Sequence, residues 1–235
     1  MTKRLSLVCT GLAFMLSLTL GQNFVFADNR GEAFLASEFQ EIRGYVSTEA
    51  RFYPHREVLA GQSRHQASIA AEPEYYVEWA NYTSLTITPF AHIDFADSRR
   101  THVDMREFLL RVVPGNWELA LGFGKVFWGV AEAKHLVDVV NQTDIIESLD
   151  GEDKFGQPMA HFSFSYDWGF VDFFVMPYFR ERIFPSRSGR LRSAILVDAG
   201  QSRFRSGAGR WHPDFAVRYS NNIGSWDVGV SHFYG

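Results

Sequence analysis

The feature that most constrains this chain is a period-two alternation of apolar and polar residues. In segment 84–96 almost every second residue is apolar, and the residues between them include His92 and Asp94. Segments 66–80, 158–168 and 169–180 repeat the pattern. Successive side chains of a β-strand point to opposite faces, so the alternation predicts strands with one apolar and one polar face.

Applied along the chain, the alternation predicts nine strands. Most are longer than the roughly five to six residues usual in soluble proteins, and their length suits tilted membrane-spanning strands. Gly122 and Gly124 interrupt one of them and indicate a bulge there. The predicted strands are Ile42–Phe52, Gln66–Ala80, Ser84–Ala96, Val103–Val113, Trp117–Trp128, Pro158–Trp168, Gly169–Arg180, Trp211–Ser220 and Ser225–Tyr234.

The connections between these strands alternate in length. Three connections are long and one is intermediate, and they alternate with short turns. The long connections are Tyr53–His65, Gly129–Gln157 and Glu181–Arg210, the intermediate one is Asp97–His102, and the short ones are Asn81–Thr83, Pro114–Asn116, Asp167–Gly169 and Asn221–Gly224. Transmembrane barrels combine short periplasmic turns with long external loops and carry aromatic girdles near the strand ends. The aromatic residues near strand ends are Tyr75, Trp79, Phe95, Trp117, Trp168, Phe179, Trp211 and Trp226.

The predicted fold is therefore an all-β, antiparallel, up-and-down transmembrane β-barrel. Single-chain bacterial barrels close with an even number of strands, so nine strands predict an incomplete barrel, an open curved sheet cut from a longer product. The first alternative is a soluble, secreted β-sandwich that binds a ligand, since alternation also describes a half-buried sheet. The second is a membrane-embedded barrel enzyme.

The first 27 residues have the pattern of a secretory signal peptide. Lys3 and Arg4 precede an apolar stretch, and small residues precede a cleavage site after Ala27. Residues 28–235 are then the N-terminal part of one outer-membrane barrel domain. Removing two basic residues leaves 21 Lys and Arg against 27 Asp and Glu, which disfavours a nucleic-acid partner. The single cysteine, Cys9, lies within the signal.

Charged and polar residues on the polar face of the strands are predicted to line a water-filled pore. Their mixed charge predicts a transverse field that sorts passively diffusing solutes by size and dipole. The predicted pore-lining residues are Arg43, Ser47, Glu49, Arg51, Glu74, Glu78, His92, Asp94, Glu107, Arg111, His161, Ser163, Ser165, Asp172 and Arg218.

The connection Gly129–Gln157 holds seven acidic residues and is too long for a plain turn. One hypothesis folds it into the lumen, where Asp138, Asn141 and Asp144 form a constriction. The alternative is an external loop in which Asp and Asn side chains cap local structure. The sequence leaves both open.

The connection after Arg180 is rich in arginine. Arginine's planar fork suits phosphate and carboxylate, so one hypothesis has these residues contact lipopolysaccharide or anionic solutes. The alternative is a solvated charged loop. The candidate contacts are Arg182, Arg187, Arg190 and Arg192.

The sequence predicts no enzyme. It contains no nucleophile elbow, phosphate-binding loop, zinc-protease motif or dinucleotide fingerprint, so no catalytic residue and no cofactor are assigned. His135 and Asp138 are three residues apart but lack a third ligand, so no metal site is predicted.

The segment "V-x-W-G-x-A" at Val126–Ala131, followed by Asp138-Val139-Val140-Asn141 and Asp144, comes after a "G-x-W-x-L-x-L-G" strand ending at Gly122. This sequence pattern resembles that of a family of porin-like bacterial outer-membrane proteins catalogued as a domain of unknown function. The resemblance covers most of Met105–Gly235, and the family members are longer than this chain. The resemblance implies a passive pore or export conduit that works beside an inner-membrane pump, and it does not identify the substrates. Taken with the predicted barrel, the expected solutes are small and polar or amphiphilic, and the expected partners are outer-membrane lipids and lipopolysaccharide.

Overall fold

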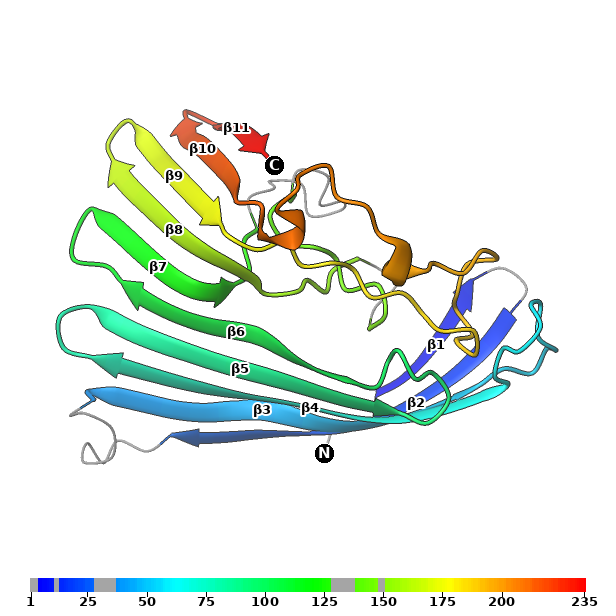
Figure 1. Ribbon diagram of the computed structural model, residues 1–235. Coiled ribbons are helices and arrows are strands. Elements are labelled where there is room, and N and C mark those ends of the chain that lie inside the picture. Colours follow the sequence, from blue (N-terminus) through cyan, green and yellow to red (C-terminus); the bar gives the residue numbers. More distant parts are fainter. Residues whose placement is uncertain (1–3, 11–12, 28–36, 128–137, 148–150) are drawn as a thin grey trace.

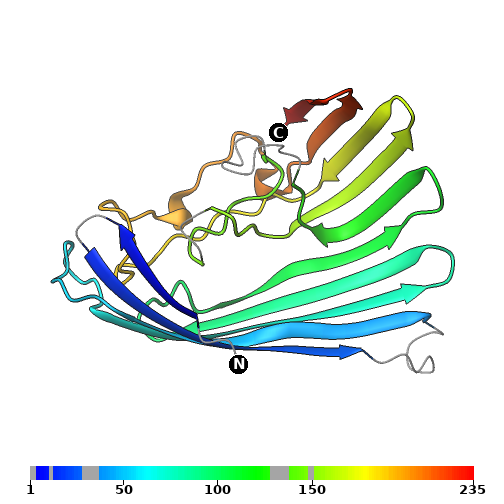
Figure 2. The same ribbon diagram turned by 180° about the vertical axis from the view of Figure 1, so that it is seen from behind.

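One antiparallel sheet dominates the fold. The computed structural model describes residues 4–10, 13–27, 37–127, 138–147 and 151–235, and within them eleven strands each pair with the next one in the chain, without a crossover (Figures 1 and 2). The sheet is open, with β1 and β11 at its two edges. The strands are β1 (Arg4–Thr10), β2 (Ala13–Ala27), β3 (Phe39–Phe52), β4 (His65–Trp79), β5 (Thr83–Asp94), β6 (His102–Val112), β7 (Trp117–Gly124), β8 (Gln157–Tyr166), β9 (Gly169–Met176), β10 (Asp214–Ile223) and β11 (Trp226–Tyr234).

The nine strands expected from the alternation correspond to β3–β11, so the all-β, up-and-down antiparallel prediction is confirmed. The described strands form a single sheet, so the two-sheet sandwich was wrong. Two further strands, β1 and β2, come from the residues with the signal-peptide pattern, and β2 pairs with β3 over most of its length. Cleavage after Ala27 stays a prediction. No helix in the described part of the chain is long and apolar enough to cross a membrane.

Several strand boundaries differ from the prediction by up to four residues. For example, β3 begins at Phe39 instead of Ile42, and β10 ends at Ile223 instead of Ser220. β7 ends at Gly124 rather than Trp128, which lies outside the described residues. β9 ends at Met176 because Pro177 has no N–H to continue the ladder, so Phe179 lies in the connection and contacts Phe204 instead of the sheet. β10 begins at Asp214, because Gly209–Trp211 forms a 3₁₀ turn before it.

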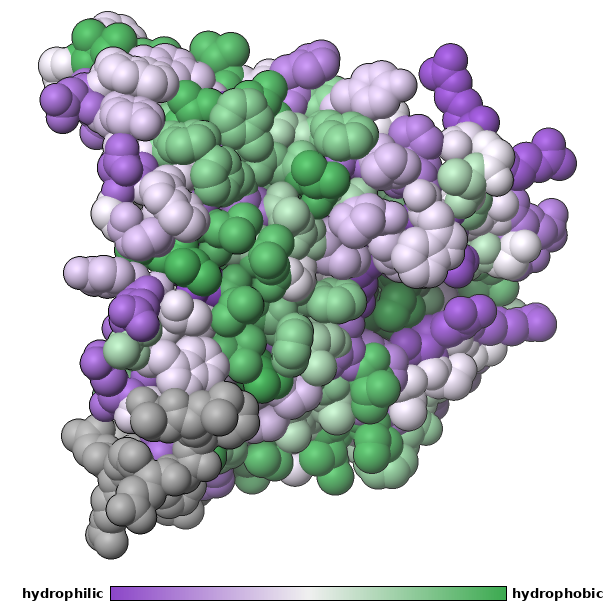
Figure 3. Space-filling model, turned by 60° about the vertical axis from the view of Figure 1, so that its left-hand side comes forward, coloured by the Kyte–Doolittle hydropathy of each residue, from purple (hydrophilic) through white to green (hydrophobic). Residues whose placement is uncertain are grey.

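The sheet has two chemically different faces. We call inner the face that carries His92 and Asp94, which are buried under the long connections, and outer the opposite face. The outer face exposes apolar side chains on strand after strand, and apolar groups gather in a broad band across the molecule in Figure 3. The exposed apolar residues of the outer face include Ile42, Val46, Ile69, Ile93, Val103, Phe108, Leu110, Leu121, Phe173, Val175 and Phe215.

Aromatic rings form a row along the short-turn end of β7–β10. Trp117, Phe162, Phe164, Tyr166 and Trp168 follow one another with ring centroids 4.5–6.2 Å apart. The row continues to β10, where the ring of Tyr219 lies 6.1 Å from that of Trp168 and its hydroxyl donates to the Trp168 carbonyl. Such pairs stabilise a sheet across its strands.

A bulge in β6 aims Arg106 at the inner face. The pairing with β5 passes from Thr88–Glu107 to Pro89–Met105, so Arg106 is an extra residue without a partner in the ladder. Strict alternation would direct Arg106 and Glu107 to opposite faces, and the bulge brings both to the inner face. The side chain of Arg106 is thereby almost fully buried.

No shift of register occurs at Gly122, so the bulge predicted in that strand was wrong. Gly122 is needed there for another reason. Its φ is +126°, and a Cβ would lie 2.0 Å from the Phe108 carbonyl oxygen. Glycine permits this close approach of β6 and β7.

All long connections of β3–β10 leave the same end of the sheet, as the alternation of loop lengths predicted, and those after β7 and β9 lie on the inner face (Figure 1). Beneath them, Val140, Met159, Phe174, Met176 and Ala216 form a small apolar cluster.

Candidate functional site

The connection between β7 and β8 folds inward onto the sheet. Its described residues form a small hairpin, in which Thr143 and Lys154 make a β-bridge and the Asp144 amide donates to the Asp153 carbonyl at 2.8 Å. Val140, Asn141, Asp144, Ile146 and Phe155 are buried. The described part of this connection therefore lies against the inner face of the sheet, and its role as a constriction of a pore stays a prediction. We call residues 138–147 and 151–156 the inner loop.

Asn141 holds the base of the inner loop. Its side-chain amide donates to the carbonyls of Gly124 and Phe155, both at 2.8 Å, and its side-chain oxygen accepts from the Val126 amide at 2.8 Å. These three bonds satisfy backbone groups where β7 ends, which is a structural role.

Arg106 ties the middle of the inner loop to the sheet. Its guanidinium donates to Asp144 at 2.6 Å and to Asp104 at 3.3 Å, and lies 3.9 Å from Glu72. The carboxylate of Asp144 is fully buried. The same guanidinium lies 4.2 Å from the centre of the Phe90 ring, a favourable cation–π distance.

Arg180, from the connection after β9, completes this cluster. It binds Asp104 and donates to the Gly156 carbonyl at 2.6 Å. The ring of Phe155 is buried between two guanidinium groups. The guanidinium of Arg180 lies 5.0 Å from the ring centre, and the guanidinium of Arg106 lies 5.6 Å from it. Arginines from the sheet and from a second connection thus fix the inner loop in place.

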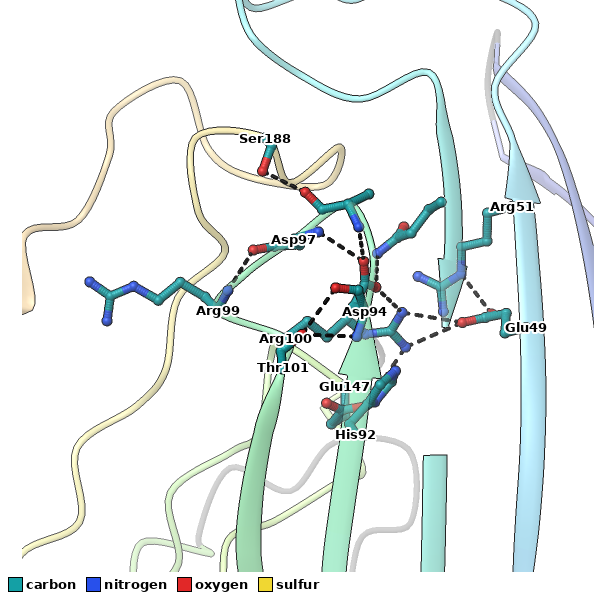
Figure 4. A network of polar contacts seen from close by, with 12 residues as sticks. Glu49, Arg51, His92, Asp94, Asp97, Arg99, Arg100, Thr101, Glu147 and Ser188 are labelled. Carbon is teal, nitrogen blue, oxygen red and sulfur yellow. Dashed lines mark hydrogen bonds and ion pairs between the residues drawn. The ribbon is translucent and has the colours of Figure 1, made fainter. Parts of the chain in front are cut away.

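A second charged cluster lies closer to the long connections (Figure 4). Arg100, in the connection between β5 and β6, donates to Glu49 of β3 and Asp94 of β5, both at 3.2 Å. Gln66 donates to the same Asp94 oxygen at 2.6 Å, and Arg51 donates to Glu49 at 2.6 Å. Strands β3, β4 and β5 are therefore cross-linked on their inner face.

Glu147 joins the inner loop to this second cluster. Its carboxylate lies 2.6 Å from Nδ1 of His92, 3.6 Å from Arg100 and 3.8 Å from Nε2 of His102. Glu147 thus attaches the inner loop to the sheet beside the attachments through Asp144 and Asn141.

Between the two clusters lies a polar cavity of about 220 Å³. Taking about 30 Å³ per water, it has room for roughly seven waters, or a small polar solute. Its lining carries both signs of charge on the sheet and negative charge on the inner loop. The lining residues are Tyr45, Ser47, Glu49, Arg51, Ser68, Ala70, Glu72, Phe90, His92, Arg100, Arg106, Glu147 and Asp153.

The predicted pore-lining residues all lie on the inner face, but only some meet at the cavity. Ser47, Glu49, Arg51 and His92 line it, and Asp94 is buried behind Arg100. The others lie toward the short turns, where Arg43 donates to Glu74 at 2.7 Å and His161 lies 2.9 Å from Asp172. This second group comprises Arg43, Glu74, Glu78, Glu107, Arg111, His161, Ser163, Ser165, Asp172 and Arg218.

Of the predicted constriction residues, Asp138, Asn141 and Asp144 are all buried, so none presents an open carboxylate to the cavity. Glu147 and Asp153 of the same loop line it instead. His135, considered above as a metal ligand, lies outside the described residues.

The four candidate anion contacts are engaged differently. Arg190 donates to the carbonyls of His55 and Arg56 and lies over the Tyr53 ring, whose burial raises the pKa of its hydroxyl. Arg192 donates to the Ala60 and Arg187 carbonyls. Arg190 and Arg192 thus hold the connection after β9 to that after β3.

Arg182 and Arg187 are exposed, and Arg182 donates to Gln142 at 2.8 Å. These two remain candidates for an anion.

Sequence reasoning did not assign Arg106, Arg100, His102 or Glu147 to the site. Strict alternation does not assign Arg106 to the inner face, because Arg106 is the extra residue of the bulge. Arg100 lies outside any strand, so alternation does not apply to it. Glu147 was one of seven acids in its connection, and nothing in their spacing distinguishes it. The only available signal was the density of acidic residues there, which indicated cationic partners elsewhere.

Comparison of the chain with models of protein families, with curated proteins and with solved structures finds no match.

Proposed function

We propose that this sheet forms part of the wall of a porin-like conduit in the bacterial outer membrane. We further propose that the inner loop narrows the aqueous path through this conduit. The observation that carries the proposal is the opposition of the two faces. One exposes apolar side chains, while the other carries ion pairs onto which an acidic loop folds.

The outer face supports a lipid-facing role. Phe108, Val103 and Ile93 are 44%, 83% and 52% exposed, and similar residues continue over neighbouring strands. Water-soluble monomers seldom expose so extended an apolar surface. Because an unpaired strand edge is not tolerated in hydrocarbon, the proposal requires that both edges of the sheet be paired in the membrane.

The cavity supports passage of small polar solutes. The lining carries four carboxylates, those of Glu49, Glu72, Glu147 and Asp153, against the three guanidinium groups of Arg51, Arg100 and Arg106. Acidic rings favour cations in channels, so we propose a narrow, cation-preferring path. Contact with lipopolysaccharide belongs to the same proposal and is supported by the exposed Arg182 and Arg187, whereas cooperation with an inner-membrane pump is supported by the family resemblance.

Conductance in planar bilayers tests the function. The full chain should produce ohmic steps, and its reversal potential in a KCl gradient should show cation preference. Glu72→Gln should weaken that preference because it removes charge from the cavity lining. Glu57→Gln is the matched control, since Glu57 is exposed in the connection after β3 and should leave selectivity unchanged.

Absence of conductance, or equal selectivity in the Glu72 and Glu57 variants, would contradict the proposal. Fractionation tests the location independently. The protein should sediment with outer membranes and require detergent for extraction, whereas a protein recovered from the periplasm without detergent would contradict a membrane location.

A further inference from the structure

Two histidines and a glutamate meet where the inner loop touches the sheet. His92 of β5 and His102 of β6 are directly opposite in the ladder, and their rings stack with centroids 6.5 Å apart. Glu147 faces both of them from the inner loop. All three side chains are nearly excluded from solvent.

The hydrogen bonds fix where the protons are in the neutral state. A carboxylate only accepts, so Nδ1 of His92 donates to Oε2 of Glu147 at 2.6 Å. A carbonyl also only accepts, so Nδ1 of His102 donates to the Arg100 carbonyl at 3.2 Å. In a neutral imidazole the second nitrogen is then an acceptor.

Consequently, no proton lies between His102 and Glu147. Nε2 of His102 and Oε1 of Glu147 are two acceptors that face each other at 3.8 Å. Both atoms are buried, and neither has a hydrogen-bond partner among the described residues. Buried acceptors without a donor are unfavourable, which gives this pair an affinity for a proton.

We infer that His102 and Glu147 form a proton-binding site that latches the inner loop to the sheet. A proton on Nε2 of His102 turns two facing acceptors into a charge-assisted hydrogen bond between sheet and loop. The inference rests on the proposed function only in its consequence, a narrower conduit at acid pH. The contact between His102 and Glu147 does not depend on that function.

Charged groups from several elements face the pair. Arg100 of the β5–β6 connection lies 3.6 Å from Glu147. Glu49 of β3 and Asp94 of β5 pair with Arg100. Arg106 of β6 and Asp153 of the inner loop also line the adjoining cavity and carry opposite charges.

Histidine is the side chain whose charge ordinarily changes between about pH 5 and 8, so this is the range over which the latch is tested. By linkage, a site that binds the proton more tightly when the loop is docked favours the docked loop when it is protonated. A charge-assisted hydrogen bond corresponds to about a tenfold shift or more in that equilibrium.

The primary test is amide hydrogen exchange of residues 138–147 in the full chain in detergent micelles. Protection factors, corrected for the intrinsic pH dependence of exchange, should rise about tenfold between pH 7.5 and 5.5. His102→Phe keeps a stacked ring but removes the proton site, so its protection should not change with pH. Conductance measured in parallel should fall as the pH is lowered in the wild-type protein and should not change in His102→Phe.

Glu147→Gln provides a second variant with the opposite signature. Its amide oxygen still accepts from His92, and its amide nitrogen can donate permanently to Nε2 of His102. Protection should therefore be high at both pH values. His161→Phe is the matched control, because His161 pairs with Asp172 within the sheet and should leave the wild-type pH response intact.

Equal wild-type protection at both pH values would overturn the latch, as would a pH response that survives in His102→Phe. If protection follows the latch but no variant conducts, the latch stands and the proposed conduit fails. The two proposals are thus separated by the same set of samples.

Discussion

At the scale of single residues, Arg106 shows how a buried charge is retained. Its guanidinium donates hydrogen bonds to Asp144 and Asp104 and also lies over the face of the Phe90 ring. A buried ion pair contributes little net stability compared with apolar residues, but removal of one partner leaves an uncompensated charge. The bond between Arg106 and Asp144 therefore fixes where the inner loop docks.

Arg106→Met should lower the free energy of unfolding by about 3–5 kcal/mol, because Asp144 is left buried and unpaired. The double variant that also carries Asp144→Leu should recover much of that loss. Denaturant titration in micelles, followed by tryptophan fluorescence, measures both.

Arg111→Met is the control on the same strand. The side chain of Arg111 is 47% exposed and pairs with Glu118 at 3.2 Å, so its loss should lower stability by no more than about 1 kcal/mol. Equal losses for Arg106→Met and Arg111→Met would show that the buried pair does not hold the loop.

At the scale of elements, close approach between strands decides where glycine is needed. Gly122 and Gly115 both have positive φ, at +126° and +103°. Only Gly122 is crowded, since a Cβ at Gly115 would meet nothing within 4 Å. A comparison of substitutions at Gly122 and Gly115 therefore distinguishes the effect of backbone strain from the effect of steric overlap.

Gly122→Ala should destabilise the sheet more than Gly115→Ala. Each variant carries strain of order 1–3 kcal/mol from positive φ, and Gly122→Ala must in addition separate β6 from β7. Refolding yield into micelles and the unfolding midpoint measure the difference. If Gly115→Ala were as damaging, overlap with the Phe108 carbonyl would not be the cause.

At the scale of the whole molecule, the two faces should respond oppositely to charge. Phe108 lies near the middle of β6 on the outer face, whereas Ser163 lies on the inner face opposite Asp172. The proposal places the first in hydrocarbon and the second in water.

Phe108→Arg should therefore lower stability in lipid bilayers by about 2–4 kcal/mol, whereas Ser163→Arg should be tolerated. Unfolding in liposomes measures the effect of each substitution. A Phe108→Arg protein that inserts and unfolds like the wild type would place the outer face outside the membrane.

The sequence by itself determined strands β3–β11, their two faces and the common end of the long connections, because a period of two and turn composition act over a few residues. It could not determine the bulge that turns Arg106 inward, because bulges depend on the register between neighbouring strands. Nor could it bring Arg100, His102 and Glu147 together, since they meet only when β3–β6 curve and the inner loop docks. Tertiary structure decided these contacts because buried charges must find partners, and those partners lie far away in the chain.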